Sequence, residues 1–259
     1  MSEDSAKGRI IWVDLTTPDP QRAKAFYGAV FGWEYAEQDR GADGFYRVVS
    51  AGGQGFGGML SMAEIGNPDD DVPAHWMPYF YTEQVQQVTD RAAELGATVY
   101  MPMREISGVS RFSVIGGPQM DTFAPMQPLM EGDPPSDTPP VGGPIWYELV
   151  APDQKGGAKF YADLFELTTV SAPMPDGEYL LLKQSGRDIA GVMQAPPEMP
   201  VAGWCPYFRI DDIEAARLRI TEHGGQSLTD VMTVPDTGDI SVAIDPVGAV
   251  FGMLVPSWL

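Results

Sequence analysis

The sequence is poor in the two side chains that most often carry metal and redox chemistry. It has one cysteine, Cys205, and two histidines, His75 and His223, in 259 residues. A lone cysteine forms no internal disulfide and has no second cysteine with which to build a zinc or dithiol site. The composition therefore favours a reducing compartment, and we expect Cys205 to pack as a small apolar side chain.

Basic residues and long apolar segments are also scarce. The chain has 16 Lys and Arg against 36 Asp and Glu, a formal net charge of −20. This charge repels nucleic acid backbones and anionic lipid surfaces. The opening MSEDSAKGRI is polar, and no apolar run reaches the roughly 18 residues of a transmembrane helix. We expect a cytoplasmic protein that binds neither nucleic acid nor a membrane.

What the sequence does contain is an internal repeat. The segment IIWVDL returns as IWYELV, with Trp146 standing 134 positions after Trp12. Farther along, WMPYFYTEQV at 76–85 returns as WCPYFRIDDI at 204–213, now 128 positions later. The difference is a deletion in a loop. Because the chain is long enough for two domains of ordinary size, the repeat predicts two tandem domains.

A segment rich in proline and glycine, PLMEGDPPSDTPPVGGP at 128–144, lies between the two copies. Such residues disfavour the interiors of helices and strands. We therefore predict an N-terminal domain at 1–130, a linker at 131–141 and a C-terminal domain at 142–259.

Each half shows the same predicted order of elements. A short apolar strand precedes a helix with an aspartate, Asp19 or Asp153, at its N-cap position. Short strands with glycine turns follow, and a second strand leads into a second helix that ends at Gly96 or Gly224. Two βαβββ modules per half are predicted, and the fold class is α+β.

This order resembles the vicinal oxygen chelate superfamily, which includes glyoxalase I, bleomycin-resistance proteins and extradiol dioxygenases. The motifs that carry the resemblance are DPQRAKAFYGAVFGW after the first strand and DPVGAVFGML near the end. The likeness covers nearly the whole chain, twice, and looks most like the tandem two-domain glyoxalase-like subgroup. It implies that paired βαβββ modules form open, curved sheet cups that hold a small molecule. The superfamily hosts several reactions and also binders without chemistry, so the fold fixes no reaction.

The resemblance also implies metal-binding positions on the cup-facing strands, and metal ligands are missing from them. These positions fall on Trp12 and Trp146, Gly58 and Gly191, Met77 and Cys205, and Ala124 and Gly252. Tryptophan, alanine and glycine side chains supply no donor to a divalent metal. We therefore expect no metal and no cofactor.

The two histidines have different settings. His223 follows a helix C-terminus, where the helix dipole favours a cation. His75 begins a strand and is a candidate ligand-binding residue at the mouth of a cup. The alternative for His75 is a rim histidine that is hydrogen-bonded to the backbone.

Two acids recur beside the missing metal positions. Side chains two residues apart on a strand point the same way, so Asp14 shares a face with Trp12, and Glu148 with Trp146. A buried carboxylate with apolar neighbours has a raised pKa, which suits a general acid or base. Asp14 and Glu148 are thus the candidate catalytic residues, and the two tryptophans are candidate binding residues. Alternatively, each carboxylate only accepts hydrogen bonds from the backbone or from a tyrosine of a neighbouring strand.

Four further candidates for substrate binding lie on the strands before the second helices: Tyr79, Tyr81, Tyr207 and Arg209. Arg209 is able to clamp an anionic group of a ligand, or alternatively to pair with Glu148. Tyr79 and Tyr207 recur at one position and are alternatively shared core residues.

The leading hypothesis is a metal-independent protein that binds a small apolar or aromatic metabolite and catalyses proton transfer on it, as a lyase, isomerase or cyclase. The alternative is a binder of the bleomycin-resistance type, which sequesters a cationic drug or metabolite unchanged; a third is a dioxygenase-like enzyme with unusual metal ligands. Because fusion of two domains replaces dimerisation of single ones, we expect a monomer or a weak homodimer.

Overall fold

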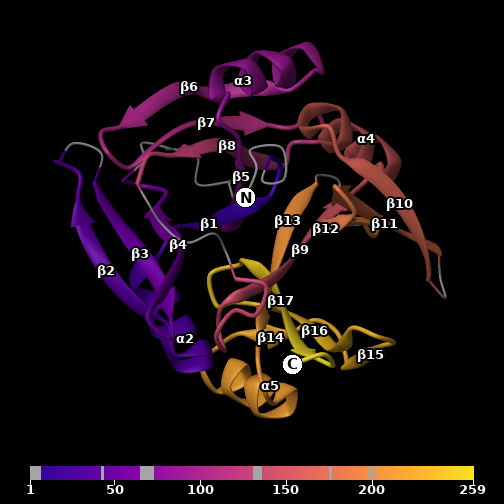
Figure 1. Cartoon of the computed structure of the whole chain (residues 1–259). Helices are drawn as coiled ribbons and strands as arrows, with labels where there is room; N and C mark the ends of the chain where they lie inside the picture. The colour runs from indigo at the N-terminus through magenta and orange to yellow at the C-terminus, as the bar shows by residue number, and fades with distance from the viewer. Residues whose placement is uncertain are drawn as a thin grey trace. The chain divides into compact units, whose positions relative to one another are not determined.

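Four βαβββ modules of one design make up the structure, a computed structural model that describes residues 7–41, 44–64, 73–130, 136–174, 177–197, 199 and 202–259. In each module a strand leads into a helix, and antiparallel strands follow (Figure 1). The last strand of the module then pairs with its first strand in parallel. The helix of each module packs against strands of its own sheet.

The first half of the chain contributes two modules. The first consists of β1 (Ile10–Thr17), α2 (Pro20–Phe31), β2 (Glu34–Asp39), β3 (Phe45–Ala51) and β4 (Gln54–Ser61). The second consists of β5 (His75–Tyr81), α3 (Val85–Glu94), β6 (Thr98–Ile106), β7 (Ser110–Gly116) and β8 (Thr122–Pro128).

The second half repeats this order. The third module consists of β9 (Pro144–Ala151), α4 (Gln154–Phe165), β10 (Thr168–Met174), β11 (Gly177–Gln184) and β12 (Arg187–Gln194). The fourth consists of β13 (Gly203–Arg209), α5 (Ile213–Glu222), β14 (Gln226–Ser227), β15 (Met232–Val234), β16 (Gly238–Ile244) and β17 (Val250–Pro256). The predicted α+β class and the two βαβββ modules per half are confirmed.

The N-caps of the first helix in each half are also as predicted. The Asp19 carboxylate accepts a hydrogen bond from the backbone N–H of Arg22 at 3.0 Å, and Asp153 accepts one from Gly156 at 2.9 Å. These bonds satisfy amides that have no partner within the helix, so each aspartate fixes where its helix begins.

Contacts divide the chain into two compact units, and each unit joins modules from both halves. The first unit comprises Met1–Trp12, Met77–Pro134 and Tyr147–Trp204, and contains most of the second and third modules. The second comprises Val13–Trp76, Pro135–Trp146 and Cys205–Leu259, and contains most of the first and fourth. The boundaries at 130 and 142 follow the sequence repeat and stay a prediction; residues 131–135 of the linker lie outside the described residues.

Aromatic side chains fill the core of the first unit. Phe80 of β5 stacks on Phe165 of α4 with ring centroids 4.7 Å apart, and Phe123 of β8 meets Tyr161 edge to face at 5.1 Å. All four residues are 0% exposed. The α4 helix of the third module is thus held against strands of the second.

The second unit is packed in the same way. Phe31 of α2 lies 5.3 Å from Phe208 of β13, and Tyr27 lies 5.5 Å from Phe251 of β17, centroid to centroid. The predicted apolar face of this helix is buried. It is directed at strands of the fourth module.

A buried hydrogen bond accompanies each aromatic core. Tyr27 donates its hydroxyl to Asp245 Oδ2 at 2.9 Å, and Tyr161 donates to Asp121. The two aspartates lie in the turns that close the fourth and second modules. Burial raises the pKa of Asp121 and of Asp245 above the ordinary value of 3.8.

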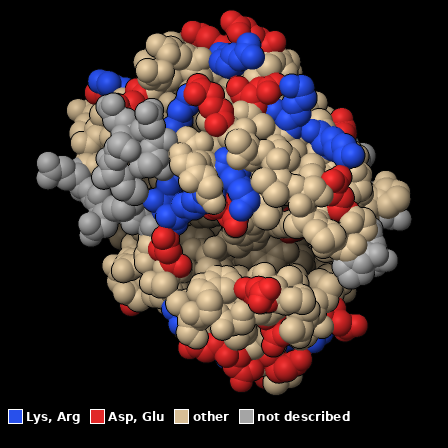
Figure 2. All heavy atoms as spheres, turned by 45° about the vertical axis from the view of Figure 1, so that its right-hand side comes forward, with Lys and Arg blue, Asp and Glu red and all other residues tan. Residues whose placement is uncertain are grey.

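On the face drawn in Figure 2, acidic side chains are interspersed with lysines and arginines.

The longest helices among the described residues, α2 and α4, have 12 residues each, and none of the described helices is long and apolar enough to cross a bilayer.

The raised pKa of Asp245 predicts how stability depends on pH. A carboxyl with a raised pKa in the folded state stabilises the protein fully below its unfolded pKa, and this contribution is lost as the pH rises through the folded pKa. Asp245→Asn cannot ionise. We therefore expect wild type to gain stability relative to Asp245→Asn as the pH falls from about 7 toward about 4. Urea unfolding over this range checks this.

The control is Asp230→Asn, which removes a fully exposed carboxylate. Its stability difference from wild type should stay nearly constant over the same pH range. Parallel pH profiles for wild type and Asp245→Asn would contradict a raised pKa at Asp245.

Candidate functional site

The first repeat brings Asp14 and Tyr46 together through strand register. Asp14 on β1 stands opposite Gly58 on β4, and Val48 on β3 stands opposite the same glycine. Tyr46 precedes Val48 by two residues, so its side chain is on the face of Val48 and reaches diagonally across β4. Its hydroxyl donates to Asp14 Oδ1 at 2.8 Å.

Glycine at position 58 is required for this bond. A Cβ atom added there would overlap both the Tyr46 hydroxyl and the Asp14 carboxylate. The tyrosine therefore crosses β4 only because Gly58 has no side chain. The position that the family resemblance assigns to a metal ligand is filled by a hydrogen-bonded pair.

The second repeat builds the same arrangement. Glu148 on β9 stands opposite Gly191 on β12, and Leu181 on β11 stands opposite that glycine. Tyr179 donates its hydroxyl to Glu148 Oε2 at 2.8 Å, and a Cβ atom at Gly191 would overlap that hydroxyl. We call Asp14 with Tyr46, and Glu148 with Tyr179, the carboxylate–tyrosine pairs.

Both acids and Tyr46 are shielded from solvent, and Tyr179 is half-buried. Asp14 is 1% exposed, Glu148 is 6% and Tyr46 is 8%. A buried carboxylate needs a hydrogen-bond donor, and in each pair the tyrosine hydroxyl supplies one. The alternative interpretation, in which each carboxylate only accepts hydrogen bonds, also predicts a bond from a tyrosine. The catalytic role of the two acids therefore stays a prediction.

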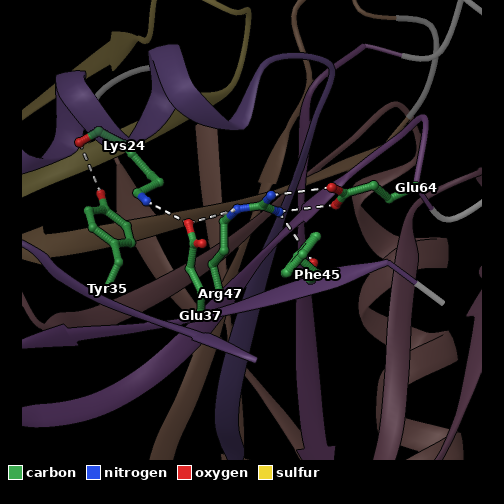
Figure 3. A network of polar contacts seen from close by, with 6 residues as sticks. All are labelled: Lys24, Tyr35, Glu37, Phe45, Arg47 and Glu64. Atoms are coloured by element: carbon green, nitrogen blue, oxygen red, sulfur yellow. Dashed lines mark hydrogen bonds and ion pairs between the residues drawn. The ribbon is translucent and has the colours of Figure 1, made fainter. Parts of the chain in front are cut away.

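A polar network fixes the strand that carries Tyr46 (Figure 3). The next residue, Arg47, is 5% exposed and binds both oxygens of Glu64, with Nη1–Oε2 at 3.1 Å and Nη2–Oε1 at 3.3 Å. Its Nε lies 3.7 Å from Glu37 Oε1, which also accepts from Lys24 of α2 at 2.8 Å. Because neighbouring residues of a strand face opposite ways, this network holds β3 from behind the pair.

Four aromatic candidates lie on the first strands of the four modules, and they form two small apolar clusters. Trp12 packs with Tyr79 of β5 in a cluster that includes Met77 and Ala124. Trp146 packs with Tyr207 of β13, whose ring covers Gly252. Tyr79 and Tyr207 are each 5% exposed, as expected of shared core residues. Ligand contact by these four residues stays a prediction.

The three remaining candidates have local partners. Tyr81 donates to Glu83 at 2.9 Å, and Arg209 Nη1 donates to the carbonyl of Pro139 at 2.8 Å. His75 Nδ1 lies 3.0 Å from the Pro73 carbonyl, which is the backbone bond of the alternative interpretation. Burial lowers the pKa of His75.

The side chains at the implied metal positions do not fit a divalent cation. The Tyr46 hydroxyl occupies the space beside Gly58, and Trp12 and Ala124 have no side-chain donor suited to a metal. Within the described ranges, no three His, Cys, Asp or Glu side chains are grouped closely enough to hold a metal ion.

The sequence analysis missed Tyr46 and Tyr179. Their signal is a tyrosine that recurs 133 positions apart, with Gly58 and Gly191 recurring at the same spacing. The strand register is needed to show that each tyrosine reaches a carboxylate across the glycine.

Comparisons with known proteins agree with this architecture. Residues 9–119 match the family model described as Glyoxalase/Bleomycin resistance protein/Dioxygenase superfamily. The "Putative glyoxylase CFP32" of Mycobacterium tuberculosis is 29% identical over 248 residues, 95% of this chain and 94% of that protein. The anthracycline biosynthesis protein DnrV of Streptomyces peucetius is 28% identical over 270 residues, 96% of this chain and 94% of that protein.

A solved structure shares the fold along nearly the whole chain. The Mn(II)-bound glyoxalase from Novosphingobium aromaticivorans superimposes with a TM-score of 0.69 at 14% identity, over 97% of this chain and 83% of that one. At this identity the likeness concerns the fold.

Gly58→Ala should break the first pair. The added methyl group displaces the Tyr46 ring, and we expect unfolding free energy to fall by about 1–3 kcal/mol, measured by urea unfolding. Gly28→Ala is the control, because its methyl group would lie 3.8 Å from the nearest atom, the Trp33 carbonyl oxygen. That helix substitution should be neutral or stabilising by about 0.5–1 kcal/mol.

In a Tyr46→Ala background the Gly58→Ala change should cost much less, because the overlapping ring is gone. An equal cost in both backgrounds would show that Gly58 is needed for another reason.

Proposed function

We propose that this chain, whose residues 9–119 match the Glyoxalase/Bleomycin resistance protein/Dioxygenase superfamily model, binds a small apolar or aromatic metabolite at its carboxylate–tyrosine pairs and catalyses proton transfer on it without a metal ion. The supporting observation is that a buried acid and a tyrosine recur in the same register in both repeats. A reaction of the lyase, isomerase or cyclase type fits such a pair.

In this proposal Asp14, or Glu148 in the second repeat, is the general base. The carboxylate takes a proton from a carbon beside a carbonyl group of the ligand, and the electron pair of that C–H bond moves to the carbonyl oxygen as an enolate. The proton is then returned to another atom, or a leaving group departs. Tyr46 or Tyr179 keeps the carboxylate oriented by donating its hydroxyl hydrogen.

The relatives support an aromatic ligand. DnrV is named for anthracycline biosynthesis, and anthracyclines are polycyclic aromatic compounds with ketone groups. The half-buried tryptophans, Trp12 and Trp146, supply flat apolar surface of the kind that binds such rings.

The alternative, sequestration of a cationic ligand without reaction, is favoured by one observation. The net charge of −20 attracts cations and repels anions at long range. Binding that weakens steeply with added salt, with the ligand recovered unchanged, would support it.

Asp14→Asn and Glu148→Gln test the proposed chemistry. The probes are anthraquinones that carry a ketone side chain, incubated in heavy water, with deuterium incorporation at the carbon beside the ketone measured by mass spectrometry. We expect wild type to accelerate exchange and loss of the active base to reduce it by about 10²- to 10⁴-fold.

Asp90→Asn, on an exposed helix face, is the matched control and should exchange like wild type. Urea unfolding verifies that each variant is folded. Binding without accelerated exchange in wild type would reject proton transfer in favour of sequestration.

A further inference from the structure

Arg40 covers the ring of Tyr46. Its guanidinium carbon lies 3.9 Å from the ring centroid, within the range of a cation–π contact. Its backbone N–H donates to the Gly44 carbonyl at 2.9 Å, which fixes the chain where β2 ends. The first carboxylate–tyrosine pair therefore has a positive charge on the face of its tyrosine.

Among the described residues, no carboxylate forms an ion pair with Arg40. Many basic side chains of this acidic chain lie beside a carboxylate, as Arg47 does with Glu64 and Lys24 with Glu37. Arg40 makes no ion pair with any carboxylate in the ranges that the structure describes. Its guanidinium stacks on Tyr46 by its face, and stacking of this kind leaves N–H groups at the edge for a ligand.

The second pair differs at this position. Gln38 stands opposite Tyr46, and Ala172 stands opposite Tyr179 in the same antiparallel register. Two residues farther along, Arg40 corresponds to Met174, which is 44% exposed. The two pairs thus share a carboxylate and a tyrosine but differ in the residue at this strand position.

We propose that Arg40 makes the first pair selective for a ligand with a carboxylate group, whereas the second pair, with Met174, takes a neutral ligand. The inference rests on the proposed function only in using the same pairs as binding sites. A planar guanidinium binds a carboxylate through two parallel hydrogen bonds. In a protein that repels anions overall, a local cation that makes no ion pair with a described carboxylate is the feature that admits one.

The reciprocal substitutions Arg40→Met and Met174→Arg test this assignment, because each gives one repeat the residue of the other. The probes are 2-naphthoate, an aromatic carboxylate, and its neutral methyl ester, with binding measured by calorimetry. We expect Arg40→Met to weaken naphthoate binding by about 10- to 100-fold and to leave the ester within about twofold. Met174→Arg should add a second naphthoate site.

Arg40→Lys and Arg104→Gln complete the set. Lysine retains the positive charge but lacks the planar guanidinium that donates two parallel hydrogen bonds. Intermediate naphthoate affinity is therefore expected. Arg104, an exposed arginine on β6, is the charge-matched control and should bind like wild type. Equal weakening of both probes by Arg40→Met would mean that Arg40 only packs on Tyr46 and would overturn the proposal, as would ester binding by wild type without naphthoate binding.

Failure of this proposal is separable from failure of the proposed function. Charge selectivity is measured by binding alone, and proton transfer by deuterium incorporation. Selective naphthoate binding with no exchange on any ketone would support Arg40 and reject the base role of Asp14.

Discussion

In each compact unit, a helix tyrosine reaches an aspartate in the turn that closes another module. The equivalent tyrosines Tyr27 and Tyr161 bind Asp245 and Asp121, but the two aspartates are not equivalent in sequence. Asp245 opens its turn through a backbone bond to Ala249, whereas Asp121 ends its turn through a bond from Gly117. A Cβ at Gly117 would overlap the Asp121 carboxyl, so one space accepts the carboxyl from either end of the turn. Both units therefore keep the tyrosine–aspartate hydrogen bond, although the aspartate lies at a different position of the turn.

This constraint decides which face of a module is left for a site. On β1, Val13 and Leu15 are 1% and 0% exposed on the face covered by α2, and Asp14 must point the other way. The tyrosine–aspartate bond and the aromatic rings hold the same helix against strands of the fourth module. The acid of the pair is therefore directed at the second face by the same strand that builds the core, and no additional loop is needed to position it.

The sequence predicted the features that local patterns determine and missed those that register determines. Apolar periodicity and the N-caps at Asp19 and Asp153 predicted the modules, and strand alternation identified Asp14 as an inward carboxylate. The Tyr46 partner depends on how three strands align at Gly58, which no single segment encodes. The grouping of modules into compact units likewise depends on long-range ring contacts. One apolar helix face fits the strands of any module, so periodicity cannot choose among them.

Duplication gives this chain two copies of one hydrogen-bonded arrangement whose surroundings differ. The hydrogen bond of each carboxylate–tyrosine pair requires three residues, because the acid, the tyrosine and the glycine must all be retained for it to form. Asp14 and Glu148 nevertheless differ by one methylene group, and the strand position that holds Arg40 in the first repeat holds Met174 in the second. Neither difference removes the donor or the acceptor of the hydrogen bond. A pair that recurs in both repeats therefore allows its neighbouring residues to change in one repeat while the other is unaffected.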